Sequence, residues 1–210
     1  MNPSDPAKRS TGTIRWKPGQ HVVLKLREDL FTIAQMRNRP VMRFFDICSS
    51  EDSWDFPDLS QYRPLFQVFV GTVVHQRLAM RKIAIGTRCL IELPNYWIRP
   101  YSSMDRQYFT GSADSLFFGG RLIDLGPGND LDVTQAPVIK HSLSVDEDRE
   151  AIEAFELTNM WGSDDLQDRL VRHFTTGIDR DDLKFVIFPD LWPDRQALSP
   201  LTRRLPERLR

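Results

Sequence analysis

Apolar side chains alternate with polar ones near the start of the chain. Val22, Leu24 and Leu26 occupy every second position, and Lys25 lies between two of them. A period of two places every second side chain on the same face of a β-strand. This segment therefore predicts a strand with one buried face, followed by a short turn and a return strand over residues 30–36.

Several later segments have the residue types that favour strands. β-Branched and aromatic side chains are common in them, and glycine or proline stands near their ends. Pro40 can open one of these strands, because the first residue of a strand does not need its N–H group. The segments predicted as strands are residues 41–47, 66–74, 88–93, 107–110, 116–118, 121–125 and 183–188.

Two helices are predicted in the second half of the chain. Ser144 and Glu147 have the spacing of a capping box, in which each side chain accepts a hydrogen bond from the backbone N–H of the other residue. We expect this helix to end at Gly162. Ser163 then caps a second helix, which Gly177 ends. Apolar residues recur at helical spacing in the second helix: Leu166, Leu170, Val171 and Phe174.

A β-rich first half followed by a helical second half predicts an α+β fold. We expect a twisted, mostly antiparallel β-sheet or partial barrel, packed by the C-terminal helices. Residues 14–192 are expected to form a single α+β domain. Residues 1–13 are predicted to be a flexible N-terminal tail and residues 193–210 a loose, basic, proline-containing C-terminal tail. Neither has enough apolar side chains to offset the entropy of ordering.

The composition is that of an ordinary globular protein and limits the classes of partner. The 210 residues include 28 Lys and Arg and 29 Asp and Glu, so the net charge is -1. A balance this close to zero disfavours bulk attraction to nucleic acid or membrane. No apolar run of about 18 residues is present, and residues 1–13 contain no secretory apolar stretch. We expect a cytoplasmic protein in which Cys48 and Cys89 are free thiols.

The near-zero total conceals a segregated charge pattern. Residues 1–43 carry a net charge of +6, and residues 63–106 one of +5. Between them, residues 44–62 contain five acidic side chains and no basic one. Residues 107–170 carry a net charge of -9, and residues 171–210 one of +2. Such segregation gives a local field when the blocks stay apart in space, and little field when they mix.

Motifs for metal, cofactor or covalent chemistry are missing from the sequence. The four histidines and two cysteines lack the spacing of a zinc site, and no P-loop, dinucleotide-binding or nucleophile-elbow motif occurs. We therefore predict no cofactor, no metal and no catalytic residue, and hence no enzyme. Two alternatives stay open. One is a hydrolytic enzyme that uses Asp and Glu carboxylates, and the other is a small nucleic-acid-binding β module that contacts phosphates through Arg37, Arg39 and Arg43.

Two acidic segments have the composition of a protein-binding surface. One is a loop with two aromatic residues, which can act as interface anchors while the flanking charge steers encounter. The other is the start of the first predicted helix, and together they would make one acidic face for a basic partner protein. The alternative is that Trp54 packs in the core and the acids only solvate the surface. The predicted partner-binding residues are Glu51, Asp52, Trp54, Asp55, Phe56, Asp58, Asp146, Glu147, Glu150 and Glu153.

A series of apolar strand patterns and one helix has a counterpart in a known family. The segments are residues 16–26, 29–36, 44–46, 64–70, 83–86 and 160–170, and the first begins Trp-Lys-Pro-Gly-Gln-His-Val-Val. In this order they resemble the immunity protein twenty-six family of bacterial polymorphic toxin systems. The resemblance implies a cytoplasmic protein that binds a cognate toxin domain and neutralises it by occlusion, without catalysis of its own.

Overall fold

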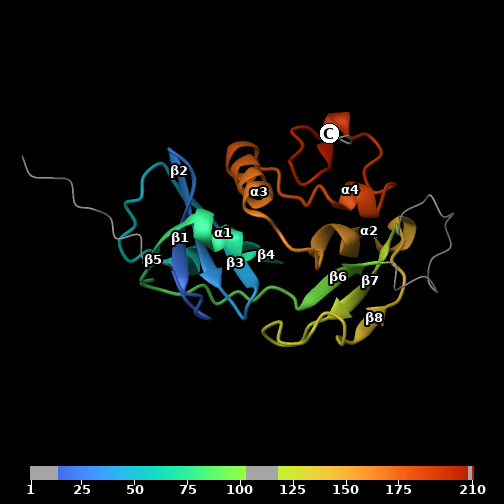
Figure 1. The fold of residues 1–210 in the computed structure, drawn as a ribbon, viewed down its shortest axis with the longest axis horizontal. Helices are drawn as coiled ribbons and strands as arrows, with labels where there is room; N and C mark the ends of the chain where they lie inside the picture. The colour runs from blue at the N-terminus through green and yellow to red at the C-terminus, as the bar shows by residue number, and fades with distance from the viewer. Residues whose placement is uncertain (1–13, 103–117, 208–209) are drawn as a thin grey trace, which may run out of the picture.

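The computed structural model describes residues 14–102, 118–207 and 210 (Figure 1). Within them, a five-stranded sheet and a three-stranded sheet are accompanied by short helices, and all neighbouring strands of the two sheets are antiparallel. Neither sheet closes into a barrel over the described residues. The predicted α+β class, with a mostly antiparallel sheet, is confirmed.

The elements fall into three groups along the chain. The larger sheet and its helical segments come first: β1 (His21–Arg27), β2 (Leu30–Met36), β3 (Val41–Ser49), η1 (Leu59–Gln61), β4 (Pro64–Phe69), α1 (Thr72–Arg77) and β5 (Ala79–Ile83). The smaller sheet follows: β6 (Tyr96–Pro100), β7 (Gly120–Asp124) and β8 (Val138–Lys140). The last group is helical: α2 (Val145–Ala154), α3 (Ser163–Thr176), α4 (Lys184–Ile187) and η3 (Gln196–Leu198).

Both faces of the larger sheet are buried, and its strand order is β4-β3-β2-β1-β5. The face that carries Val22, Leu24 and Leu26 packs against α1 and α3, as the alternation predicts. The opposite face carries Val23, which lies in a second apolar cluster beneath the loop after β3 and the segment after β5. The prediction that β1 has only one buried face is therefore wrong, because a long loop covers the second face.

The smaller sheet has the order β6-β7-β8 and lies beside β4 of the larger one. Phe69 of β4 and Trp97 of β6 join the two sheets in one apolar cluster, with ring centroids 4.6 Å apart. Ile98 belongs to another cluster, which it shares with residues of α2 and α4. The predicted strand over residues 121–125 is confirmed as β7, one residue earlier in the chain.

The strand predicted over residues 66–74 is wrong beyond Phe69. The chain turns at Gly71, whose N–H donates to the carbonyl of Trp161 at 3.0 Å, and α1 begins at the next residue. Val74 lies fully buried on α1, in the cluster that packs against the sheet. Its spacing from the apolar residues before it suits a helix as well as a strand, so the pattern alone does not separate the two.

Two other predicted strands are also wrong. Residues 88–93 form no strand and cross the larger sheet as a covering segment. Residues 183–188 contain α4, in which the N–H of Phe188 donates to the carbonyl of Lys184 at 2.8 Å. The predicted strand at 107–110 lies outside the described residues, as do the first two residues of the one at 116–118, and Phe118 itself is not in a strand.

The helix boundaries follow part of the expected chemistry. The Ser144 side chain accepts the N–H of Glu147, as predicted, but Asp148 replaces Glu147 as the acceptor of the Ser144 N–H, at 3.0 Å. The helix ends at Ala154 rather than at Gly162. Gly162, not Ser163, occupies the N-cap position of α3. Gly177 ends α3 with a φ of +76°, as predicted for a left-handed C-cap.

The C-terminal segment is packed more closely than its composition predicts. Leu205 is fully buried, and the buried Thr202 donates from its N–H to Asp182 at 2.7 Å. Arg203 contacts Asp168 of α3 at 2.7 Å. The expectation of a loose tail is therefore corrected for residues 193–207, because ion pairs and hydrogen bonds order a segment that has few apolar side chains.

Candidate functional site

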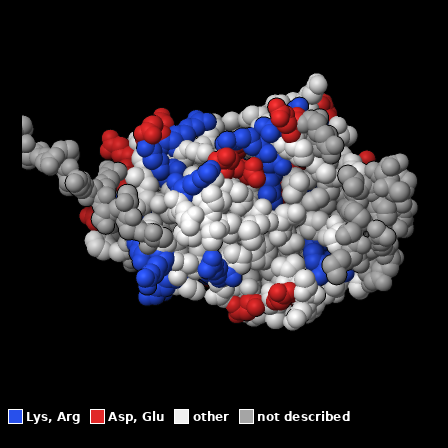
Figure 2. Space-filling view, viewed as in Figure 1, with Lys and Arg blue, Asp and Glu red and all other residues white. Residues whose placement is uncertain are grey.

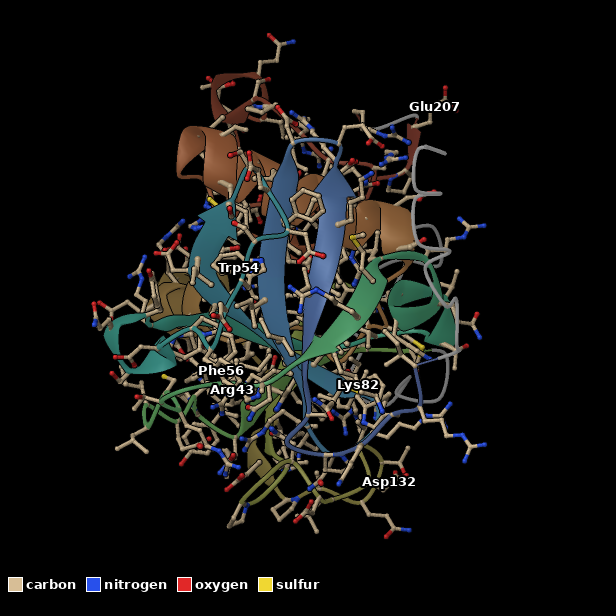
Figure 3. The ribbon with its side chains drawn as sticks, turned by 90° about the vertical axis from the view of Figure 1, so that its left-hand side faces the viewer. Arg43, Trp54, Phe56, Lys82, Asp132 and Glu207 are labelled. Atoms are coloured by element: carbon tan, nitrogen blue, oxygen red, sulfur yellow. The ribbon has the colours of Figure 1, made fainter. Side chains whose placement is uncertain are left out.

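The loop between β3 and η1 is held by backbone hydrogen bonds to the segment that follows β5. The N–H of Gly86 donates to the carbonyl of Pro57 at 3.1 Å, and the N–H of Leu59 donates to the carbonyl of Thr87 at 2.8 Å. Leu59 is fully buried and anchors the end of the loop in the sheet's second apolar cluster. In Figure 1 this loop lies at the left-hand edge of the larger sheet, and Figure 3 faces that side.

The two aromatic residues of the loop have different environments. Trp54 is half-buried and packs against the second apolar cluster. Its position therefore fits the alternative in which Trp54 packs against the core and does not anchor a partner. Phe56 is 66% exposed and has a φ of +42°, in the region that L-residues rarely adopt. Its carbonyl lies so close to Gly86 that a Cβ there would meet the oxygen at 2.8 Å. Gly86 therefore permits the backbone conformation that holds Phe56 outward.

The acids of the loop also divide into structural and exposed members. Arg81 donates to both carboxylate oxygens of Asp52, with its closest contact at 2.7 Å, so this charge is neutralised within the protein. Asp58 caps η1, and hydrogen bonds from the Ser60 side chain and backbone hold the pKa of its carboxyl below the usual range. Glu51 and Asp55 are exposed and have no ion-pair partner among the described residues.

Two exposed apolar residues lie on the neighbouring covering segment. Leu90 is 87% exposed and Ile91 is 53% exposed. Sequence reasoning missed both because it assigned them to a strand. The sequence did contain a signal, because both residues lie between the charged residues Arg88 and Glu92. Charged residues on both sides of a short apolar stretch are typical of a surface segment. Exposed apolar residues that cluster, unlike single ones, mark interaction surfaces.

The acidic residues of α2 do not join the loop. Asp146, Glu147, Glu150 and Glu153 are exposed on α2, which Figure 1 shows above the smaller sheet, away from the loop. Glu147 lies 3.1 Å from Lys140, and Glu153 lies 3.6 Å from Arg149. The expectation of one acidic face is therefore wrong, because the two segments accompany different sheets.

Charge blocks that are separate in the sequence lie side by side around α3 and the C-terminal segment. Figure 2 shows basic and acidic side chains interleaved around α3 and the C-terminal segment. Asp164 lies 3.9 Å from Arg77 and 3.8 Å from Arg203, which come from two other blocks. The field expected from segregated blocks is therefore cancelled here. The loop before η1 keeps negative charge at Glu51, Asp55 and Asp58, which have no ion-pair partner among the described residues.

The basic residues proposed to contact phosphates are mostly enclosed. Arg43 is 2% exposed and half-buried Arg37 lies beside it, and both contact Glu92. Arg39 alone of the three is exposed. They therefore form no open basic face of the kind that tracks a nucleic-acid backbone.

The fold and the exposed surface together define the class of this protein. It is an α+β protein whose exposed aromatic loop and apolar covering segment form a candidate protein-binding surface. The chain belongs to the family described as Domain of unknown function (DUF8309), whose model matches residues 11–193. Neither the curated proteins nor the solved structures contain a match.

Two properties of the described residues concern metal ions and membranes. No group of three or more His, Cys, Asp or Glu residues among them is placed to hold a metal ion. No helix in that part of the chain has both the length and the apolar character needed to cross a membrane. Cys48 and Cys89 are free thiols, as expected.

Proposed function

We propose that this protein is an immunity protein that binds a cognate toxin domain and neutralises it by occlusion, without catalysis of its own. The observation that carries the proposal is Phe56, a largely exposed aromatic side chain on a loop that is tied down beside it. Aromatic side chains that fill a partner's pocket supply much of the binding energy of protein interfaces. The resemblance to the immunity protein twenty-six family supports the same function.

The fixed conformation of the loop favours tight binding. A left-handed φ at a non-glycine residue costs on the order of 1 kcal/mol and persists only where the surroundings impose it. Here the hydrogen bonds that join Pro57 to Gly86 and Leu59 to Thr87 impose it. Because the loop is already ordered, a partner that takes up Phe56 loses little conformational entropy from this side of the interface.

The surroundings of Phe56 indicate the chemistry of the partner. Glu51 and Asp55 carry unpaired negative charge on the same loop, and Leu90 and Ile91 add exposed apolar area on the covering segment. A complementary surface has an apolar pocket with lysine or arginine side chains around it. Such charge complementarity mainly raises the association rate.

Reversing the charge of Asp55 is expected to slow association with the toxin domain. If the proposal holds, a large secreted protein with a toxin domain at its C-terminus is encoded beside the gene for this chain. That domain is the probe, and binding is measured by surface plasmon resonance. We expect Asp55→Lys to lower the association rate constant about tenfold at low salt. The difference should shrink at high salt, where the charges are screened.

Asp146→Lys is the matched control for this charge reversal. Asp146 is an exposed acid of α2, outside the proposed surface. We expect its reversal to change the association rate by less than about twofold. An equal loss with both variants would mean that total charge, not the Phe56 loop, drives association. A toxin domain that fails to bind the unaltered protein would contradict the proposed function.

A further inference from the structure

A row of polar side chains crosses the face of the larger sheet that the covering segment encloses. Strand register places His21 of β1 opposite Gln35 of β2, Gln35 opposite Arg43 of β3, and Arg43 opposite Gln67 of β4. His21, Arg43 and Gln67 are buried. Val23, Ile33 and Phe45, which lie next to the row on the same face, are buried and apolar. Burying polar groups costs free energy unless they have partners, so a polar row within an apolar face suggests a binding role.

Three members of this row line a pocket of about 220 Å³ beneath residues 88–92. Two further arginines reach the same pocket, one from the end of β2 and one from the covering segment. The side chains that give it its polar character are His21, Gln35, Arg37, Arg43, Arg88 and Glu92.

Positive charge exceeds negative charge in this pocket. Three guanidinium groups and one carboxylate line it. Glu92 is the shared partner of Arg37, at 3.2 Å, and of Arg43, and its own side chain is 62% exposed. The Nε atom of the buried Arg43 has no hydrogen-bond partner within the described part of the chain. Buried charges are normally paired, so the excess calls for a further anion.

Arg88 and His21 complete the arrangement. Arg88 is exposed and has no ion-pair partner within the ranges that the structure describes. Burial, with Arg88 and Arg43 nearby, lowers the pKa of His21 to about 4, so the imidazole is neutral at pH 7. A neutral imidazole beside guanidinium groups can donate one hydrogen bond to an oxyanion without adding charge.

The pocket continues into a second hollow that gives room for more than an anion. This hollow encloses about 390 Å³ and shares His21 and Arg88 with the first. Its walls are the turn over residues 17–20 and the chain over residues 83–85. A ligand can therefore place a charged group among the arginines and extend its body along the neighbouring hollow.

We propose that this paired pocket binds a small molecule through a phosphate or carboxylate group, which Arg43, Arg88 and His21 hold. Arginine forks match both groups, and charge-assisted hydrogen bonds are roughly twice as strong as neutral ones. The proposal does not rest on the proposed function, because neither Phe56 nor the acids of its loop line the pocket, although Leu90 borders both surfaces.

Titration calorimetry with the full chain tests the proposal. The probes are inorganic phosphate and succinate, each at an ionic strength held constant with sodium chloride. We expect saturable binding of at least one probe at a single site with a dissociation constant of about 1 mM or below. Binding of phosphate alone assigns the pocket to phosphorylated compounds, and binding of succinate alone assigns it to carboxylates.

Two charge-removing variants make the test specific. Arg88→Gln should weaken binding about tenfold, because it removes one charge-assisted contact. Lys82→Gln removes the same charge from an exposed residue that lines neither hollow and lies apart from Arg43 in Figure 3, so binding should change less than about twofold. Equal weakening by both variants, or no saturable binding of either probe up to about 20 mM, would overturn the proposal.

Discussion

Replacing Asp182 with asparagine is expected to lower the free energy of unfolding by about 3–5 kcal/mol. Asp182 is fully buried, and its carboxylate accepts hydrogen bonds from Arg172 at 2.8 and 3.0 Å and from Arg180 at 2.9 Å. Asparagine keeps the shape of the side chain but removes its charge. The buried Arg172 would then carry an uncompensated charge, which is among the most costly defects of a protein interior.

The same substitution should loosen the C-terminal segment. The N–H and hydroxyl groups of Thr202 donate to Asp182 at 2.7 and 2.9 Å, and these bonds join the segment to the chain after α3. Hydrogen exchange at the Thr202 amide should therefore accelerate in Asp182→Asn. Urea unfolding gives the stability change, with Asp190→Asn, an exposed acid, expected within about 0.5 kcal/mol of the unaltered protein. A loss below about 1 kcal/mol for Asp182→Asn would contradict the assignment of a structural ion pair.

Protonation of His21 is expected to destabilise the protein between pH 6.5 and pH 4. Burial is the main reason that its pKa falls from 6.5 to about 4, and the positive charges of Arg88 and Arg43 add to the effect. Between these values the unfolded chain binds a proton that the folded chain does not. The free energy of unfolding therefore falls as the pH falls, by on the order of 3 kcal/mol over this window from His21.

His21→Gln isolates this contribution because glutamine does not titrate. Carboxyls such as those of Asp46 and Glu92, whose pKa values are lowered by hydrogen bonds from His173 and Arg43, also lose stabilising interactions as the pH falls. Their effect is common to both proteins and cancels in the difference. Urea unfolding from pH 7.5 to pH 4 should show that the unaltered protein loses on the order of 3 kcal/mol more stability than His21→Gln as the pH falls. Parallel curves over this range would contradict an enclosed, neutral His21.

Local patterns predicted the first three strands and the end of α3 well. The alternation at Val22, Leu24 and Leu26 and the left-handed stop at Gly177 depend on neighbours within a few residues. The strand expected through Val74 failed because packing beneath α3 decides between helix and strand there. The order of the C-terminal segment was also missed, since Asp182 and Thr202 are 20 residues apart and their bond has no local signal.

The candidate sites were predicted less completely than the fold. The sequence indicated the aromatic loop, but it could not distinguish the exposed Phe56 from the half-buried Trp54. Nor could it separate the paired Asp52 from the exposed Asp55, because Arg81, the partner of Asp52, lies on β5, 29 residues further along the chain. The polar row could not be predicted for a related reason. Its members are aligned by the strand register, and the register depends on pairing between strands that are separate in the sequence.

The central claim is that Phe56 anchors a toxin domain on this protein, and titration calorimetry with the neighbouring-gene toxin domain tests it most directly. Ile139→Ala is the matched control, because Ile139 is also a largely exposed apolar residue but lies on β8, outside the proposed surface. We predict that Phe56→Ala weakens binding about 30-fold or more and that Ile139→Ala changes it less than about twofold. Binding by Phe56→Ala as tight as that of the unaltered protein would contradict the claim.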